Sequence, residues 1–265
     1  MLALDIDGTL VDGTLEITPA NLAALKDVVA RGVRVVLATG RMFRSALRYA
    51  EEIGTDEPLI VYQGAVVRMP DGRVLREWAV RPDAARLAVS LSRELGIHVN
   101  LYREDDFYVE TMSWAGRSYA DIAQIEPVVV ADLMTIAAKG STKVVFVDTH
   151  ERLVEVGNTI RSAFEPASRV TFSMPEFLEV VDGGVSKAAA LQYVCDRHGI
   201  AANEVIAAGD GPNDRELFEF CGLAVAPSDA IPEVLEAADF TMPPPGQDGI
   251  AYLVAHHLAA DRRNL

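Results

Sequence analysis

Several short runs of apolar residues in this 265-residue chain are continuous rather than alternating with polar residues. They are Leu2–Ile6 (interrupted only by Asp5), Val33–Ala38 (interrupted only by Arg34), Leu59–Tyr62, Val205–Ala208 and Leu223–Ala226. Continuous apolar strands are typical of a sheet covered on both faces, as parallel sheets are in α/β proteins. Amphipathic segments separate the runs, and the first begins at Thr18-Pro19, a typical helix start. The sequence therefore predicts an α/β fold with a doubly wound, mainly parallel, Rossmann-like core sheet.

The regular alternation of strands and helices is interrupted in the middle of the chain. It weakens near Arg81-Pro82 and returns after Gly183-Gly184. We therefore expect residues 1–80 and 184–265 to form one core domain, with residues 81–183 as an inserted α+β domain. Such insertions are tolerated because the ends of a domain often lie close together.

The charge and composition exclude several classes of protein. Acidic residues outnumber basic residues by 39 to 24, which gives a formal net charge of −15. Nucleic-acid binders and polybasic membrane-surface proteins need clustered Lys and Arg, so neither partner is expected. The two cysteines, Cys195 and Cys221, cannot form a disulfide framework. With no apolar stretch of roughly 20 residues, we expect a cytoplasmic protein that is a monomer or a small homo-oligomer.

The first polar motif, Asp5-Ile6-Asp7-Gly8-Thr9, lies where the first apolar run ends. Side chains alternate along a strand, so Asp5 and Asp7 project to the same side. Ligands of open α/β sheets bind beyond the carboxyl ends of the strands. Two carboxylates repel each other there unless a cation or a proton intervenes, and Gly8 allows a sharp turn that exposes amide donors. Taken alone, the pair would more often be a solvated acidic turn.

Two further motifs supply donors for an anion. Thr39-Gly40-Arg41 follows the second apolar run and combines a hydroxyl, a glycine amide and a guanidinium, although Thr39 could simply cap a helix. Lys187 opens a helix, where a cation is unfavourable unless an anion lies nearby. The chain has only four lysines (26, 139, 143 and 187), so Lys187 is not routine surface composition, although a solvated lysine is the simpler alternative.

The fourth motif, Gly209-Asp210-Gly211-Pro212-Asn213-Asp214, follows another buried run. Its carboxylate and amide oxygens are hard ligands suited to Mg²⁺. It lacks the spacing of an EF-hand loop and the third glycine of a dinucleotide-binding fingerprint. A tight acidic turn is the alternative, but a second one after a strand is unlikely to arise by chance.

Together the four motifs resemble those of the haloacid dehalogenase superfamily. The long insertion between the second and third motifs resembles the large-capped (C2-capped) Cof-type sugar-phosphate phosphatases. The resemblance covers both segments of the core, whereas the cap matches by position and size only. An aspartate at position 7 resembles the phosphatase and phosphomutase branches rather than the dehalogenases.

The resemblance implies a role for each motif residue. Asp5 is the expected nucleophile and Asp7 the general acid and base. The expected Mg²⁺ ligands are Asp5, the backbone carbonyl of Asp7, and Asp210, with Asp214 orienting metal-bound water. The residues expected to bind the phosphate are Gly8, Thr39, Gly40, Lys187 and Asn213.

The expected activity is Mg²⁺-dependent hydrolysis of small phosphate monoesters such as sugar phosphates, nucleotides or phosphorylated cofactors, through an aspartyl-phosphate. A sugar phosphomutase with the same aspartate pair and a non-catalytic phosphate-binding regulatory protein remain alternatives. The chain departs from the family at position 63, where Gln63-Gly64 replaces the common Asn-Gly. The sequence assigns no definite role to Gln63 or Arg41, and it does not identify the cap residues that select the substrate.

Overall fold

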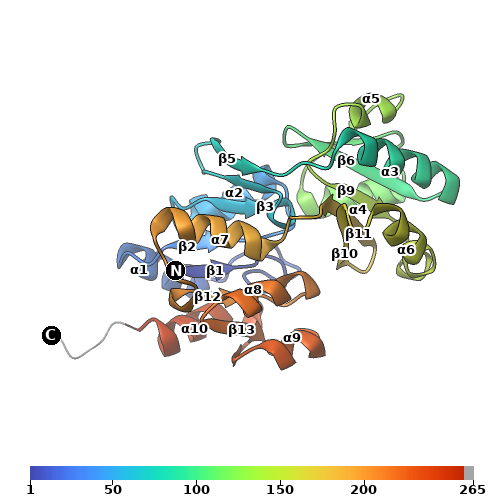
Figure 1. Ribbon diagram of the computed structural model, residues 1–265. Coiled ribbons are helices and arrows are strands. Elements are labelled where there is room, and N and C mark those ends of the chain that lie inside the picture. Colours follow the sequence, from blue (N-terminus) through green and yellow to red (C-terminus); the bar gives the residue numbers. More distant parts are fainter. Residues whose placement is uncertain (260–265) are drawn as a thin grey trace.

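The computed structural model describes residues 1–259, which form two regions that lie side by side (Figure 1). The first region contains a five-stranded parallel sheet with the strand order β14-β13-β12-β1-β2. Its strands are β1 (Leu2–Leu4), β2 (Val35–Leu37), β12 (Ile206–Ala208), β13 (Leu223–Pro227) and β14 (Phe240–Met242). A parallel bridge between Ala38 and Ile60 continues it into the antiparallel strands β3 (Leu59–Val61), β4 (Val66–Arg68) and β5 (Val74–Glu77).

Helices cover both faces of this parallel sheet. Leu2 and Leu4 of β1 pack in one cluster with residues of α1 (Pro19–Ala30), α2 (Phe43–Ile53) and α10 (Gly249–His257). Ala3 points the other way and packs with α7 (Lys187–His198), α8 (Arg215–Phe220) and α9 (Pro232–Ala237). This double burial explains the continuous apolar runs and confirms the predicted doubly wound α/β core.

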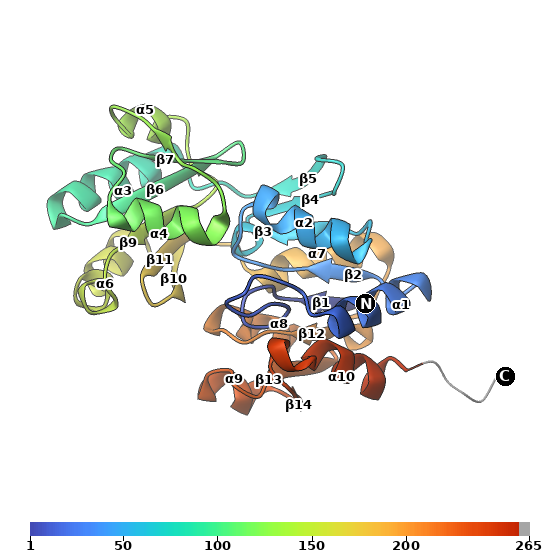
Figure 2. The same cartoon turned by 180° about the vertical axis from the view of Figure 1, so that it is seen from behind.

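The second region contains a mainly antiparallel six-stranded sheet in the order β10-β11-β9-β6-β7-β8. Its strands are β6 (His98–Arg103), β7 (Asp106–Val109), β8 (Val128–Val129), β9 (Val144–Val147), β10 (Ser168–Met174) and β11 (Phe177–Asp182). Helices α3 (Pro82–Leu95) and α6 (His150–Phe164) pack on one face with Val144 and Phe146. On the opposite face, Val145 and Val147 pack with α4 (Trp114–Ala123). Figure 2 shows α4 on the side nearer the core.

The structure therefore has a separate cap region, as the inserted α+β domain requires, while the limits of residues 81–183 stay a prediction. The sequence pattern of this region predicts a helix over Pro82–Leu95 and a strand near His98–Arg103, and α3 and β6 span these residues. Helix α4 and the short helix α5 (Met134–Ala137) in this region are not predicted by the sequence pattern. Among the described residues, no helix is both long enough and apolar enough to cross a membrane.

Candidate active site

The motif residues meet at the carboxyl edge of the parallel sheet. Asp5 follows β1, Thr39 follows β2, and Asp210 follows β12. The Asp5 N–H donates to the Ala208 carbonyl at 2.9 Å, and the Thr39 N–H donates to the Ile60 carbonyl at 2.8 Å. These bonds fix the ends of neighbouring strands together, so residues more than 200 positions apart share one site.

A buried lysine joins two of the motif aspartates. The Lys187 Nζ donates to Asp5 Oδ1 and to Asp214 Oδ1, each at 2.7 Å, and the exposed fraction of the lysine is only 1%. Asp214 Oδ2 also accepts from the N–H groups of Asp210 and Gly211, both at 3.1 Å. Three donors therefore hold Asp214 rigidly: the Lys187 ammonium, which also forms the ion pair, and two backbone N–H groups.

The acidic cluster holds more negative charge than one lysine offsets. Burial, together with the charges of Asp214 and Asp210, raises the pKa of Asp5 well above its usual value, although Lys187 opposes this. Burial and the Asp214 charge raise the pKa of Asp210 to about 7. Burial alone would lower the pKa of Lys187, but the two facing carboxylates outweigh it and raise that pKa.

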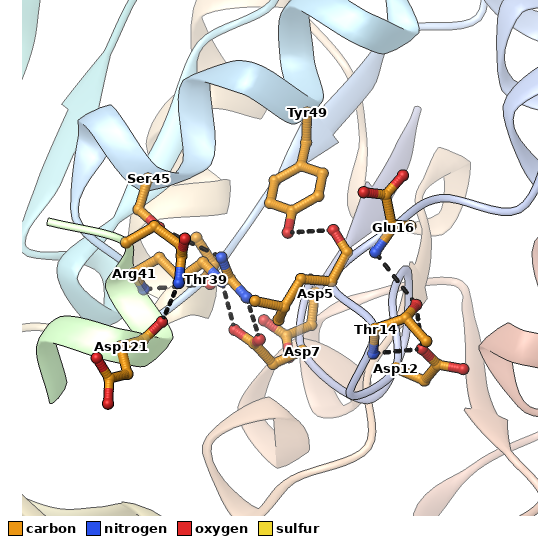
Figure 3. Close-up of polar contacts among 12 residues, drawn as sticks. Asp5, Asp7, Asp12, Thr14, Glu16, Thr39, Arg41, Ser45, Tyr49 and Asp121 are labelled. Carbon is orange, nitrogen blue, oxygen red and sulfur yellow. Dashed lines mark hydrogen bonds and ion pairs between the residues drawn. The ribbon is translucent and has the colours of Figure 1, made fainter. Parts of the chain in front are cut away.

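Asp7 does not join this cluster through its side chain but pairs with Arg41 (Figure 3). The guanidinium donates from Nε to Asp7 Oδ2 at 2.7 Å and from Nη2 to Oδ1 at 2.5 Å. Its Nη1 donates to Ser45 Oγ at 3.2 Å, which orients the fork from α2. The sequence assigns no definite role to Arg41, whereas in the structure this residue fixes the direction of the Asp7 carboxylate.

The structure corrects the expectation for Gly8. The Gly8 N–H donates to the Val11 carbonyl at 2.9 Å, so this amide is used within its own turn and not to bind an anion. Gly8 has a φ of +77°, and a Cβ at this position would lie 2.3 Å from Asp210 Oδ2. Glycine is therefore required here for the close approach of the first and fourth motifs.

The predicted phosphate-binding residues Thr39, Gly40 and Asn213 line one pocket beside Asp5 and Asp7, whereas Lys187 lies beneath Asp5. Gln63 lies in the same pocket wall, where its Oε1 accepts from Asn213 Nδ2 at 2.9 Å. Its φ of +61° is uncommon for a residue other than glycine and is typical of functional turns. A Cβ on Gly40 would lie 2.4 Å from Gln63 Nε2, so a larger residue at position 40 would displace the Gln63 amide.

The same pocket is closed on its other side by the cap region, and sequence reasoning missed this half. The cap residues that line it are Tyr119, Ile122, Ala123, Lys143, Ser173, Met174, Phe177 and Glu179. The Lys143 Nζ donates to the Gly40 carbonyl and to Glu179 Oε1, each at 2.9 Å, and so links the cap directly to the second motif. The scarcity of lysine that drew attention to Lys187 applied equally to Lys143.

Comparison with known proteins agrees with this geometry. A model of the haloacid dehalogenase-like hydrolase family matches residues 2–254. The putative phosphatase YxeH of Bacillus subtilis is 29% identical over 96% of each chain. The 5-amino-6-(5-phospho-D-ribitylamino)uracil phosphatase YitU of Bacillus subtilis is 26% identical over 98% of this chain and 97% of its own.

Solved structures with similar folds include a protein from Thermotoga maritima, with a TM-score of 0.84 and 31% identity over 96% of each chain. A haloacid dehalogenase-like hydrolase from Bacteroides thetaiotaomicron has a TM-score of 0.88 and 25% identity, covering 96% of this chain and 97% of its own. The fold, the four motifs and the match along nearly the whole chain agree. The chain therefore belongs to the haloacid dehalogenase-like hydrolases, as a phosphatase of the Cof type.

Proposed function

We propose that the protein is a Mg²⁺-dependent phosphatase that hydrolyses small phosphorylated metabolites through an aspartyl-phosphate on Asp5. The observation that carries this proposal is the Asp5 carboxylate, buried against Asp214 and Lys187 and bordering the pocket that Asp7 also lines. The names of two relatives, YitU and the HMP-PP phosphatase of Cronobacter sakazakii, support a small phosphorylated molecule as substrate.

The chemistry of the donor set fits a magnesium ion. Oxygen atoms of Asp5, Asp210 and Asp214 lie within 4.8 Å of one another. Carboxylate oxygens are hard ligands that Mg²⁺ prefers. Asp5 and Asp210, with the backbone carbonyl of Asp7, would hold the ion, while Asp214 is positioned by its own three donors. When bound, the ion supplies positive charge that neutralises the carboxylates and polarises the phosphoryl group.

The aspartate pair carries the two chemical steps. In the first, an Asp5 carboxylate oxygen forms a bond to phosphorus, the bond between phosphorus and the leaving oxygen breaks, and Asp7 gives its proton to that oxygen. In the second, water attacks phosphorus, Asp7 takes the water proton, and the bond between Asp5 and phosphorus breaks. Each Asp7 oxygen accepts one hydrogen bond from Arg41, so each keeps a second lone pair that can carry the proton.

The pocket walls bind the phosphoryl oxygens and exclude water. The Thr39 hydroxyl, the Gly40 amide and Asn213 supply donors, and Lys187 has a third N–H beyond the two that it gives to carboxylates. Phosphoryl transfer depends mostly on positioning and electrostatics, so these donors act by orienting phosphorus toward Asp5. The cap residues above them shield the reacting atoms from bulk solvent.

The test is phosphate release from p-nitrophenyl phosphate with Mg²⁺ present. We expect Asp5→Asn to abolish release, because the amide is a poor nucleophile, and EDTA to abolish it in the unaltered enzyme. Asp12→Asn, in the exposed turn where Asp12 accepts from Thr14, is the matched control and should keep full activity.

Full activity of Asp5→Asn, or full activity in EDTA, would overturn the mechanism. Transfer of phosphate between hexose phosphates in a coupled assay, without release of inorganic phosphate, would instead indicate a mutase.

A further inference from the structure

The cap wall of the pocket contains a buried ion pair. Lys143 directly precedes β9 and Glu179 lies in β11, opposite Val145. Side chains alternate along strands, so both project to the sheet face that carries Val145 and looks toward α4. The exposed fractions of Lys143 and Glu179 are 1% and 2%. The pair is therefore part of the pocket rather than of the surface.

The hydrogen bonds of Glu179 are distributed unevenly between its two oxygens. Oε1 accepts from Lys143 Nζ at 2.9 Å and from Ser173 Oγ at 2.7 Å. Oε2 is shielded from solvent and has no partner. A buried carboxylate oxygen without a donor is costly, and a native protein keeps such a group where a ligand or water completes it.

A second unpaired group lies in the core wall of the same pocket. The Gln63 side chain is buried, its Oε1 accepts from Asn213, and its Nε2 has no partner. The pocket thus offers one unpaired acceptor from the cap and one unpaired donor from the core. A ligand that completes both must carry a hydrogen-bond donor and a hydrogen-bond acceptor.

The surroundings of Glu179 define where that donor lies on the ligand. The Lys143 ammonium contacts both Glu179 and the carbonyl of Gly40, in the second motif. The Lys143 ammonium therefore lies between the Glu179 carboxylate and the proposed phosphate-binding loop. A leaving group bound in this pocket would meet Glu179 with the part nearest its phosphate. The rest of the cap wall is largely apolar, with Ile122, Ala123, Met174 and Phe177.

We propose that Glu179 determines specificity by accepting a hydrogen bond from a hydroxyl or amino group of the leaving group. The substrate class is then a phosphate monoester whose leaving group joins an apolar or aromatic face to such a donor. Gln63 Nε2 donates to an acceptor oxygen of the same ligand. This inference rests on the proposed phosphatase function and adds the chemistry of the leaving group. A site with a buried unpaired acceptor discriminates strongly against analogues that lack the donor.

The test compares substrates that differ only in a hydroxyl group. One pair is 3-hydroxypropyl phosphate and propyl phosphate; the other is 3- or 4-(hydroxymethyl)benzyl phosphate and the corresponding methylbenzyl phosphate. We expect the enzyme to prefer the hydroxyl-bearing member of at least one pair by about tenfold or more in kcat/KM. In Glu179→Gln this ratio should fall several-fold, because an amide that keeps its oxygen toward Lys143 presents N–H groups where the acceptor was. A substrate hydroxyl can then only accept a neutral hydrogen bond, which is weaker than donating one to a carboxylate.

Glu176→Gln is the matched control, since Glu176 lies in the β10–β11 turn and outside the pocket lining; it should keep the full ratio. A purely structural Glu179 would lower both members of a pair equally and leave the ratio unchanged, which would overturn the inference. Equal kcat/KM values for both members of both pairs in the unaltered enzyme would overturn it even if Glu179→Gln does not fold. Absence of any Mg²⁺-dependent release from all these esters and from p-nitrophenyl phosphate would instead refute the proposed function, and the inference with it.

Discussion

Arg41 shows how a single residue can set the geometry of a neighbouring catalytic group. Its guanidinium holds both oxygens of Asp7 and is itself oriented by Ser45. Lysine preserves the charge but cannot reproduce the planar fork, so the direction of the Asp7 carboxylate would be lost. Small errors in the placement of a reacting group reduce the rate steeply.

We therefore expect Arg41→Lys to lower kcat for p-nitrophenyl phosphate by about tenfold or more, with a smaller change in KM. Arg34→Lys is the control, because Arg34 forms an exposed ion pair with Glu57 far from the motifs. Steady-state kinetics of both variants measure the effect. An unchanged kcat in Arg41→Lys would show that the fork does not position Asp7.

At this scale the sequence predicts chemistry better than contacts. It identified Asp5, Asp210 and Lys187 as neighbours, because each lies at a strand end or a helix start and those positions converge in a parallel sheet. It could not place Gln63, whose left-handed backbone carries the side chain back against Asn213. It also misassigned the Gly8 amide, because the local turn that uses it has no distinctive composition.

The turn between β3 and β4 supports the start of α7. Gly64 has a φ of +98°, and a Cβ there would lie 2.3 Å from the Ser186 carbonyl oxygen, which is backbone and cannot rotate away. Lys187 directly follows Ser186, so the close approach of this turn to the start of α7 fixes the position of the Lys187 ammonium relative to Asp5. The glycine serves packing between elements as well as the turn.

We expect Gly64→Ala to destabilise the protein by about 2–4 kcal/mol, through strain at positive φ and displacement of the α7 start. Gly54→Ala is the matched control: its φ is +79° but no atom lies within 4 Å of the added Cβ, so it should cost only about 1 kcal/mol. Urea denaturation of both variants measures the difference. Equal destabilisation would mean that the contact with Ser186 contributes nothing.

Among the strands and helices, the sequence best predicted those that are buried on both faces or that have distinctive residues at their ends. The parallel strands β1, β2, β12 and β13 are buried on both faces, and helix α3 begins with a proline and ends at a glycine, so these elements were recognisable. Strand β14 and helices α4 and α5 were not anticipated. The pairing of β9 with β11, which brings Lys143 to Glu179 across 36 positions, depends on a strand register that no local pattern encodes.

The acidic cluster also affects the stability of the whole molecule. Burial and the Asp214 charge raise the pKa of Asp210 from 3.8 to about 7 in the folded protein. The folded protein then binds this proton more tightly than the unfolded chain. The resulting stabilisation is fully present below about pH 4 and is lost as the pH rises through about 7.

In EDTA, we expect the stability of the unaltered protein relative to Asp210→Asn to fall between pH 5 and pH 8 by about 3 kcal/mol, at 1.36 kcal/mol for each pH unit between 5 and the folded pKa of about 7. Thermal or urea unfolding of both proteins measures this difference. Mg²⁺ should restore stability to the unaltered protein at pH 8, because a ligand that binds only the folded state stabilises it. Parallel stability curves for the two proteins would contradict the raised pKa.

The pairing of β1 with β12 determines when each part of the protein can form during synthesis. Leu2 lies opposite Ile206, so β1 has no partner on that side until the ribosome has made more than three-quarters of the chain. The six-stranded sheet uses only residues 98–182 and its strands pair mostly with near neighbours, so it can form earlier. We therefore expect a protease-resistant cap and an unfolded amino-terminal segment in nascent chains that are arrested when residues up to Asp182 have just left the ribosome. The region that reads the substrate would then fold before the aspartates that act on it are brought together.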